Sequence, residues 1–286
     1  MDNASALRRQ LLAELRRLRP PRVHTQRQVA EALDWSPSKV TRIESGAVSL
    51  SVTDLRALLA YYEVSDPELV ERLVDLARRS RRARSPFAAY ADVFSAVALR
   101  FFDFEQSASW IGEVELMVVP GLLQTEEYAR ALMSVYGMGE KAERFVASRR
   151  IRQQLLERAD PPTLSCVIDE SVLLRAIGGP AVMRAQLERL LDLATRPNVA
   201  IRVIPLLLGE HVGLRGPFVL LKFAGTNDPD VVYIEQRRGD ALFQEEAEVI
   251  ANHQRLFLEL EERAAPPDEL GHYVERAIER LSRPVC

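Results

Sequence analysis

The stretch from residue 25 to residue 46, TQRQVAEALDWSPSKVTRIESG, constrains the fold of this chain most strongly. Thr25 is followed three residues later by Gln28, which is the spacing of a capping box at the start of a helix. After an interruption, Ser36-Pro37 places a cap residue before a proline at the first helical position. The stretch therefore predicts two short helices joined by a tight turn.

The second of these predicted helices has an apolar and a polar side. Val40 and Ile43 form the apolar side, and Gly46 is expected to end the helix in the left-handed conformation. The helical period places three polar residues together on the opposite side: Ser38, Thr41 and Arg42. Arginine can bind guanine through two hydrogen bonds, and Ser or Thr can bind several base edges or a phosphate. The pattern suits a helix that reads a DNA groove; an ordinary helical hairpin with a solvated polar face is the alternative.

Three further helices are predicted around this pair. Leucines recur at positions 7, 11, 15 and 18, which is the stripe of an amphipathic helix. Ser51 caps a helix over LRALLAYYEV, and Asp66-Pro67 starts another over ELVERLVDLARR. Five helices with short connections predict a compact all-α domain within residues 1–84.

The residues TQxxVAxxLxWSPSxVTRIExG resemble the helix-turn-helix of the xenobiotic-response-element (XRE) family of repressors, which is related to phage repressors. The resemblance implies a lambda-repressor-like domain that binds double-stranded DNA as a homodimer on a two-fold operator. The residues that it implies at base edges are Pro37, Ser38, Thr41 and Arg42. Those that it implies at phosphates are Gln26 and Lys39. It also suggests an ion pair between Arg19 and Glu44, tying the first helix to the recognition helix.

Two positions depart from the family pattern. Asp34 stands at the turn, where the family usually has glycine, and Asp tolerates the left-handed region better than most residues. Pro37 has no N–H to donate, so it offers a base only apolar contact, such as with a thymine methyl group. Both departures are compatible with a helix-turn-helix.

A basic run, RRSRRARSP, spans residues 78–86 at the end of this domain. It is either the solvated end of the fifth helix or an additional grip on DNA phosphates. On the second interpretation Arg81 and Arg82 bind phosphates.

The charge of the chain is divided unevenly. Residues 1–85 carry 16 Lys and Arg against 11 Asp and Glu, a net charge of +5, and the remainder carries −8. A basic module joined to an acidic one is expected if only the first contacts phosphates. No apolar run approaches the roughly 20 residues of a membrane span, and the N-terminus does not resemble a signal peptide. We therefore expect a cytoplasmic protein with no membrane segment.

Residues 85–286 predict a second domain that mixes strands and helices. The runs VAIRVIPLL, GPFVLLKF and DVVYIEQ are rich in β-branched and aromatic residues and predict strands. Helical periodicity marks AVMRAQLERLLDLAT, residues 140–159 and residues 244–263. Because helices lie outside consecutive strands, the pattern favours an α+β domain with a mainly antiparallel sheet.

The sequence shows no catalytic or metal-binding constellation. It has no Gly-rich phosphate loop, no paired metal histidines on a helix and no nucleophile elbow. Asp169-Glu170 is either a carboxylate site or a helix N-cap with an acidic neighbour, and the cap is favoured. Cys166 is predicted to be buried and inert. We expect no catalysis, cofactor or metal, and an enzyme fused to a DNA-binding domain is the alternative.

The segments VPGLLQTEEYARAL, RRIRQQLLE, SVLLRAIGG, VAIRVIPL and GPFVLLKF are similar to the C-terminal domain of actinobacterial regulators with developmental and antibiotic-pathway roles. The resemblance covers roughly residues 90–265 and implies an effector-binding domain without established chemistry. The residues expected to contact an effector or partner are Trp110, Gln124, Thr125 and Tyr128.

Together the two resemblances imply a sequence-specific transcriptional regulator of development or secondary metabolism. Its second domain would sense a small-molecule effector or a protein partner. The alternative is an antitoxin-like module that binds a small partner protein encoded nearby and autoregulates its own operon.

Overall fold

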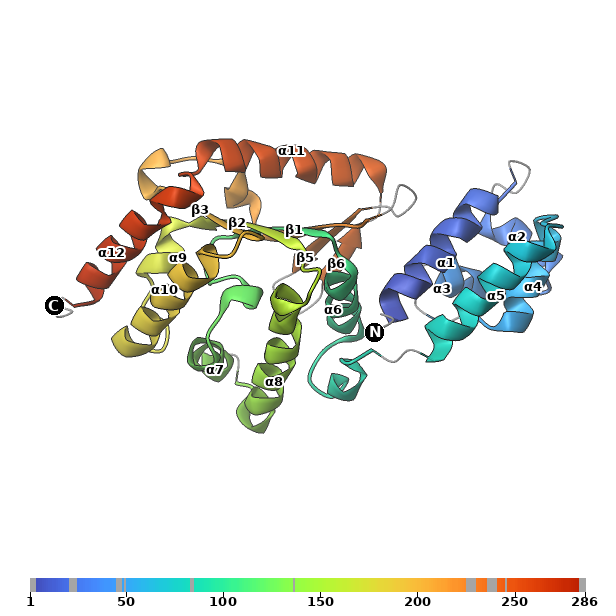
Figure 1. Ribbon diagram of the computed structural model, residues 1–286, viewed down its shortest axis with the longest axis horizontal. Helices are drawn as coiled ribbons and strands as arrows, with labels where there is room; N and C mark the ends of the chain where they lie inside the picture. Colours follow the sequence, from blue (N-terminus) through green and yellow to red (C-terminus); the bar gives the residue numbers. More distant parts are fainter. Residues whose placement is uncertain are drawn as a thin grey trace. The chain divides into compact units, whose positions relative to one another are not determined.

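The computed structural model describes residues 4–20, 25–44, 48, 50–82, 85–135, 137–224, 230–235, 241–244 and 246–282. These residues form two compact units, one within residues 1–88 and a second made of residues 89–223 and 229–286 (Figure 1). The predicted helix stop at Gly46 and the predicted domain boundary at residue 84 lie outside the described residues, so both stay predictions.

The first unit is helical, as predicted. Its described residues form α1 (Ala4–Leu18), α2 (Gln26–Ala32), α3 (Pro37–Glu44), α4 (Val52–Tyr61) and α5 (Pro67–Arg82). The capping box of Thr25 and Gln28 is present at the start of α2. At the start of α3, Ser36 Oγ accepts a hydrogen bond from the Lys39 N–H (3.2 Å). One hydrophobic core is shared by all five helices and includes Leu11, Val29, Val40, Leu55 and Val74.

The turn between α2 and α3 has the conformation expected for it. Asp34 has a φ of 53°, which is the left-handed region, and the Trp35 N–H donates to the Ala30 carbonyl oxygen (2.8 Å). Asp is one of the few non-glycine residues that adopt this conformation at moderate cost. The turn therefore keeps its geometry without the glycine usual in the family.

The second unit is built on a mixed sheet. In the described residues six strands lie in the order β3-β2-β1-β4-β5-β6. Their bounds are β1 (Trp110–Glu115), β2 (Thr163–Asp169), β3 (Val199–Ile204), β4 (Phe218–Lys222), β5 (Val231–Glu235) and β6 (Ala241–Gln244). β1 pairs with β2, and β2 with β3, in parallel; β4, β5 and β6 add in antiparallel pairs. The expectation of a mainly antiparallel sheet was therefore wrong.

The strand β1 explains this correction. It lies in the middle of the sheet, parallel to β2 on one side and antiparallel to β4 on the other. Its sequence, WIGEVE, has a glycine and two glutamates, residues that are depleted in strands, so the pattern did not predict it. Gly112 is required by packing: a Cβ there would lie 2.2 Å from the Trp110 ring.

Helices cover both faces of the sheet. Figure 1 shows α11 (Ala247–Arg263) along one face and a set of helices on the other. That set comprises α6 (Ala96–Ser107), α7 (Glu126–Val135), α8 (Ala142–Gln153), α9 (Glu170–Leu174) and α10 (Pro180–Ala194). The final helix, α12 (Leu270–Leu281), packs against α9, α10 and β3. The helix predicted over residues 140–159 is shorter, since α8 gives way to a 3₁₀ turn over Gln154–Glu157.

Two smaller predictions for this unit are confirmed. Asp169 caps α9, because its Oδ1 accepts a hydrogen bond from the Ser171 N–H (2.9 Å). Cys166 is buried in β2, and burial, followed by the charges of Glu113 and Glu115, raises the pKa of its thiol well above the ordinary value. Within the described part of the chain, no helix is long and apolar enough to cross a membrane.

Candidate functional site

The structure places the four predicted base-reading residues on the exposed side of α3. These residues are Pro37, Ser38, Thr41 and Arg42. Val40 and Ile43, on the opposite side of the same helix, are buried in the core. Arg42 Nε donates a hydrogen bond to the Ser38 carbonyl oxygen (3.3 Å). The exposed side of α3 thus presents two hydroxyls, a guanidinium group and a proline ring.

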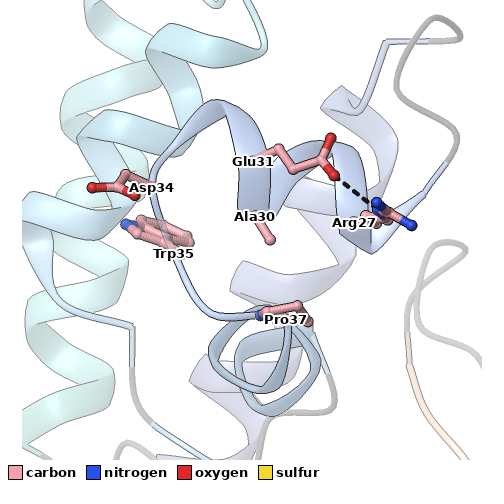
Figure 2. Close-up of a pocket in the computed structure, with 6 residues that line it drawn as sticks. All are labelled: Arg27, Ala30, Glu31, Asp34, Trp35 and Pro37. Carbon is pink, nitrogen blue, oxygen red and sulfur yellow. Dashed lines mark hydrogen bonds and ion pairs between the residues drawn. The ribbon is translucent and has the colours of Figure 1, made fainter.

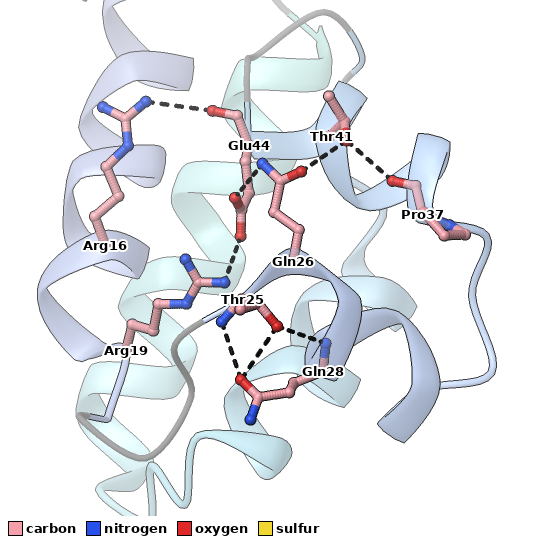
Figure 3. A network of polar contacts seen from close by, with 8 residues as sticks. All are labelled: Arg16, Arg19, Thr25, Gln26, Gln28, Pro37, Thr41 and Glu44. Carbon is pink, nitrogen blue, oxygen red and sulfur yellow. Dashed lines mark hydrogen bonds and ion pairs between the residues drawn. The ribbon is translucent and has the colours of Figure 1, made fainter. Parts of the chain in front are cut away.

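A polar network ties α3 to α1 and α2 (Figure 3). Arg19 Nη2 lies 3.1 Å from Glu44 Oε1, so the predicted ion pair is confirmed. Glu44 Oε2 accepts a hydrogen bond from Gln26 Nε2 (3.0 Å), and Gln26 Oε1 accepts one from the Thr41 hydroxyl (2.8 Å). Thr41 Oγ1 also lies 3.1 Å from the Pro37 carbonyl oxygen. The network therefore runs from Arg19, directly after the end of α1, to the exposed side of α3.

This network limits how Gln26 and Thr41 can meet DNA. Both ends of the Gln26 amide are engaged within the protein, which leaves one Nε2 hydrogen for a phosphate oxygen. The one hydroxyl hydrogen of Thr41 already has two acceptors within the protein, Gln26 Oε1 and the Pro37 carbonyl oxygen. The phosphate contact of Gln26 and the base contact of Thr41 stay predictions. In the structure both residues also hold α3 against α2 through their hydrogen bond.

A second tie joins α3 to α4. Lys39 Nζ lies 2.6 Å from Asp54 Oδ1 and 4.1 Å from the centroid of the Trp35 ring. Burial alone would raise the pKa of the Asp54 carboxyl. Hydrogen bonds from Lys39 and Ser51, together with the charge of Lys39, outweigh burial, so that pKa lies below its ordinary value. An ion pair with Asp54 competes with the phosphate contact predicted for Lys39.

Two variants separate these roles of Lys39. If Lys39 holds a phosphate, we expect Lys39→Ala to weaken binding on all sequences and to lessen the slope of log K against log salt by about one unit. Asp54→Asn removes the same ion pair but keeps the ammonium group, so its slope should not fall. Both variants should lose about 1 kcal/mol of stability or less, because the pair is partly exposed. If the salt slope is unchanged in both variants, Lys39 does not bind a phosphate and serves only to hold α3 against α4.

A hollow of about 550 Å³ lies where α2 meets the turn before α3 (Figure 2). It is lined by Arg27, Ala30, Glu31, Asp34, Trp35 and Pro37. Arg27 Nε lies 2.8 Å from Glu31 Oε1, so its charge is partly offset. With two carboxylates in the lining, the hollow does not suit a phosphate group.

The basic run at the end of the first unit is partly described. Arg81 and Arg82 lie in the last turn of α5, and both are exposed. Basic side chains at a helix C-terminus interact favourably with the helix dipole, so a structural role is also available to them. Their phosphate contacts stay predictions.

The residues predicted to contact an effector divide between the two faces of the sheet in the second unit. The Trp110 ring centroid lies 5.2 Å from that of Phe257 in α11, so Trp110 faces α11. Gln124 and Tyr128 lie on the other face, and both are buried. Gln124 Nε2 donates to the Val119 carbonyl oxygen (2.7 Å), and the Val119 N–H donates to the Tyr128 hydroxyl oxygen (3.1 Å).

Glutamine side chains hold the rest of the loop over residues 119–125. Gln186 of α10 accepts a hydrogen bond from the Thr125 N–H (2.7 Å) and donates one to the Leu123 carbonyl oxygen (2.9 Å). Gln153 of α8 donates to the Gln124 carbonyl oxygen (2.7 Å). A buried loop must satisfy its backbone polar groups, and these side chains do so. The structure thus brings Gln124, Thr125 and Tyr128 together in a structural role, apart from Trp110.

A charged cluster lies beside this loop, and sequence reasoning did not find it. Arg152 of α8 donates through Nε and Nη2 to the two carboxylate oxygens of Glu105 in α6, each at 2.7 Å. The Glu105 side chain is 1% exposed and that of Arg152 is 10% exposed. The Arg152 guanidinium carbon also lies 4.3 Å from the centroid of the Phe102 ring. This is a buried bidentate pair, the geometry in which arginine and carboxylate interact most strongly.

A second buried carboxylate, that of Glu113 in β1, faces the same arginine. Burial, followed by the charge of Glu105, raises the pKa of Glu113 to about 7. The charges of Arg152 and Arg149 and a hydrogen bond from the Gly121 N–H oppose this shift. A Cβ on Gly121 would lie 3.1 Å from Arg149 Nη1, so this position leaves little room for a side chain. The signal in the sequence was a glutamate at an inward position of a strand.

Family comparisons follow the same division into two units. Residues 98–275 match the family described as a domain of unknown function, DUF5753. The chain belongs to the DUF5753 family. The DUF5753 region contains both the loop over residues 119–125 and the charged cluster around Arg152. Residues 10–73 match the family described as a helix-turn-helix domain, which indicates a DNA-binding regulator. Neither a curated protein nor a solved structure matches this DUF5753 chain.

Proposed function

We propose that this chain is a sequence-specific transcriptional regulator of the XRE type that binds an operator through α3. The observation that carries the proposal is the exposed side of α3, where the Ser38 hydroxyl, the Thr41 side chain and the Arg42 guanidinium group lie opposite a buried apolar side. Groups of this kind read base edges in the major groove, which is wide enough for a helix. The net charge of +5 over residues 1–85 supports attraction to phosphates.

The operator is proposed to be two-fold, and the regulator to act as a homodimer. Helix-turn-helix dimers bind half-sites about one helical turn apart, roughly 34 Å, because each copy inserts one recognition helix into the major groove. A single copy of α3 contacts only a few base pairs, so a second copy raises specificity. Sedimentation of the free chain and of its DNA complex measures the number of copies in each.

The second unit is proposed to sense a signal, either a small molecule or a protein partner, without catalysis. Support comes from the buried charges of Glu105, Glu113 and Arg152, which cost stability and are often retained where they specify one conformation. Scanning fluorimetry of the chain with cell extract, fractionated by size, tests the two kinds of signal. If the fraction that raises the melting temperature of the chain passes a small-molecule filter, the signal is a small-molecule effector. If the filter retains that fraction, the signal is a protein partner.

Arg42 provides the sharpest test of base reading. We expect Arg42→Ala to weaken operator binding by about 1–3 kcal/mol and to relax the preference at one base pair, since bidentate contacts to guanine carry that much discrimination. Fluorescence anisotropy on the operator and on a scrambled duplex measures the change. Arg56→Ala, at an exposed arginine of α4 paired with Glu71 of α5, is the matched control. Equal loss on both duplexes would make Arg42 a phosphate contact.

A further inference from the structure

We propose that Thr41 recognises a thymine in the operator through its methyl group, next to the ring of Pro37. The inference rests on the proposed function, since it assumes that α3 enters a DNA groove. The group that this side chain would read is the C5 methyl of thymine, which no other DNA base presents in the major groove.

The Thr41 hydroxyl is already engaged in hydrogen bonds within the protein. It has two acceptors within hydrogen-bond distance, Gln26 Oε1 (2.8 Å) and the Pro37 carbonyl oxygen (3.1 Å), and its one hydrogen serves them. Gln26 in turn donates to Glu44, whose other carboxylate oxygen lies 3.1 Å from Arg19. Turning the hydroxyl towards a base would break a chain of hydrogen bonds that ends at a charged pair. Hydrogen bonds in such chains strengthen one another.

The direction of the Thr41 methyl group follows from that of the hydroxyl. Oγ1 and the methyl carbon share Cβ with tetrahedral geometry, so a hydroxyl turned towards α2 leaves the methyl pointing elsewhere. Figure 3 shows the carbon end of the side chain directed away from Gln26. Thr41 is exposed, and it lies on the side of α3 opposite Val40 and Ile43. The methyl group is therefore presented to solvent on the side proposed to meet DNA.

A proline neighbours Thr41 on the same side of α3. Pro37 lies four residues earlier, one helical turn away, and its ring is exposed. It has no N–H, so it offers DNA apolar surface only. The Pro37 ring and the Thr41 methyl thus form an apolar strip beside the polar groups of Ser38 and Arg42. Such a strip suits a thymine methyl. A cytosine at the same position would present its N4 amino group to the strip, which has no acceptor for it.

The experiment removes one methyl group at a time, first from the DNA and then from the protein. The operator is first selected from random DNA with the full chain. Each thymine of a half-site is then replaced by uracil, which removes only the C5 methyl, and Kd is measured by fluorescence anisotropy. We expect at least one thymine at which uracil raises Kd by about fourfold, the value of one buried methyl or methylene group (about 0.8 kcal/mol).

Two variants of Thr41 complete a double-mutant cycle with that base. Thr41→Ser keeps the hydroxyl and its bond to Gln26 but removes the methyl, so it should bind the thymine operator about fourfold more weakly and no longer distinguish uracil. Thr41→Val keeps a methyl and should keep the distinction. Thr53→Ser is the control, because it removes the same methyl group at an exposed position of α4, outside the proposed contact.

The outcomes separate this inference from the proposed function. An operator at which uracil has no effect, or a Thr41→Ser variant that still distinguishes uracil, overturns the inference while DNA reading by α3 stands. A chain that selects no sequence from random DNA overturns the proposed function and the inference with it. Loss of the uracil effect in Thr41→Ser, with the effect retained in Thr41→Val and Thr53→Ser, supports the inference.

Discussion

Replacing Arg152 with alanine is expected to lower the free energy of unfolding of the second unit by about 3–5 kcal/mol. Arg152 is the partner of Glu105, whose side chain is 1% exposed, and it also offsets the charge of Glu113. Without the guanidinium group, two carboxylates face each other in the interior. This is a large fraction of the stability of an ordinary domain, so some of the variant should be unfolded at 37 °C.

The measurement can be confined to the second unit. The chain has two tryptophans, Trp35 in the first unit and Trp110 in β1 of the second. Urea unfolding in a Trp35→Phe background therefore follows Trp110 alone. Arg150→Ala is the matched control: Arg150 lies on the same helix and pairs with Glu126, but its side chain is 65% exposed, so the loss should be under about 1 kcal/mol. Equal losses in the two variants would contradict a structural role for the buried pair.

The second large effect is a dependence of stability on pH that comes from Glu113. Because burial and the charge of Glu105 raise its pKa from 4.5 to about 7, the folded state binds more protons than the unfolded state between these two values. Stability therefore falls as pH rises from about 4.5 to about 7 and is level above that range, with a total loss of about 3 kcal/mol from this group.

Glu113→Gln tests this dependence, because glutamine has the same size and no charge. The variant should be more stable than the parent by about 3 kcal/mol at pH 8 and should lose the fall between pH 5 and 7. Glu127→Gln makes the same chemical change at an exposed position of α7 and should keep the fall. A Glu113→Gln variant whose stability still falls over this range would assign the effect to another group.

Local signals in the sequence predicted the first unit well. Caps such as Thr25 and Ser36, and the periodic burial of Val40 and Ile43, act within one or two helical turns, so they can be read directly. The ion pair of Arg19 with Glu44 is not local, and it was expected only because the stretch resembles a known family.

Contacts between distant segments explain what the sequence did not reveal. Strand β1 is stabilised by pairing with β2 and β4, so its own composition predicted no strand. Arg152 and Glu105 are separated by 47 residues, and only the packing of α8 near α6 brings them together. Lys39 and Asp54 meet for the same reason, across two helices. A candidate phosphate contact thus proved to be half of an ion pair.

Selection of bound sequences from random double-stranded DNA, with the full chain at physiological salt, tests the central claim most directly. If α3 reads bases, the selected pool will converge on a two-fold sequence with half-sites about one helical turn apart. The same selection with Arg42→Ala will converge less sharply at one position of each half-site. If the chain binds DNA but the selected pool stays random, and binding weakens as salt rises in the same way on every sequence, sequence-specific reading by α3 is contradicted.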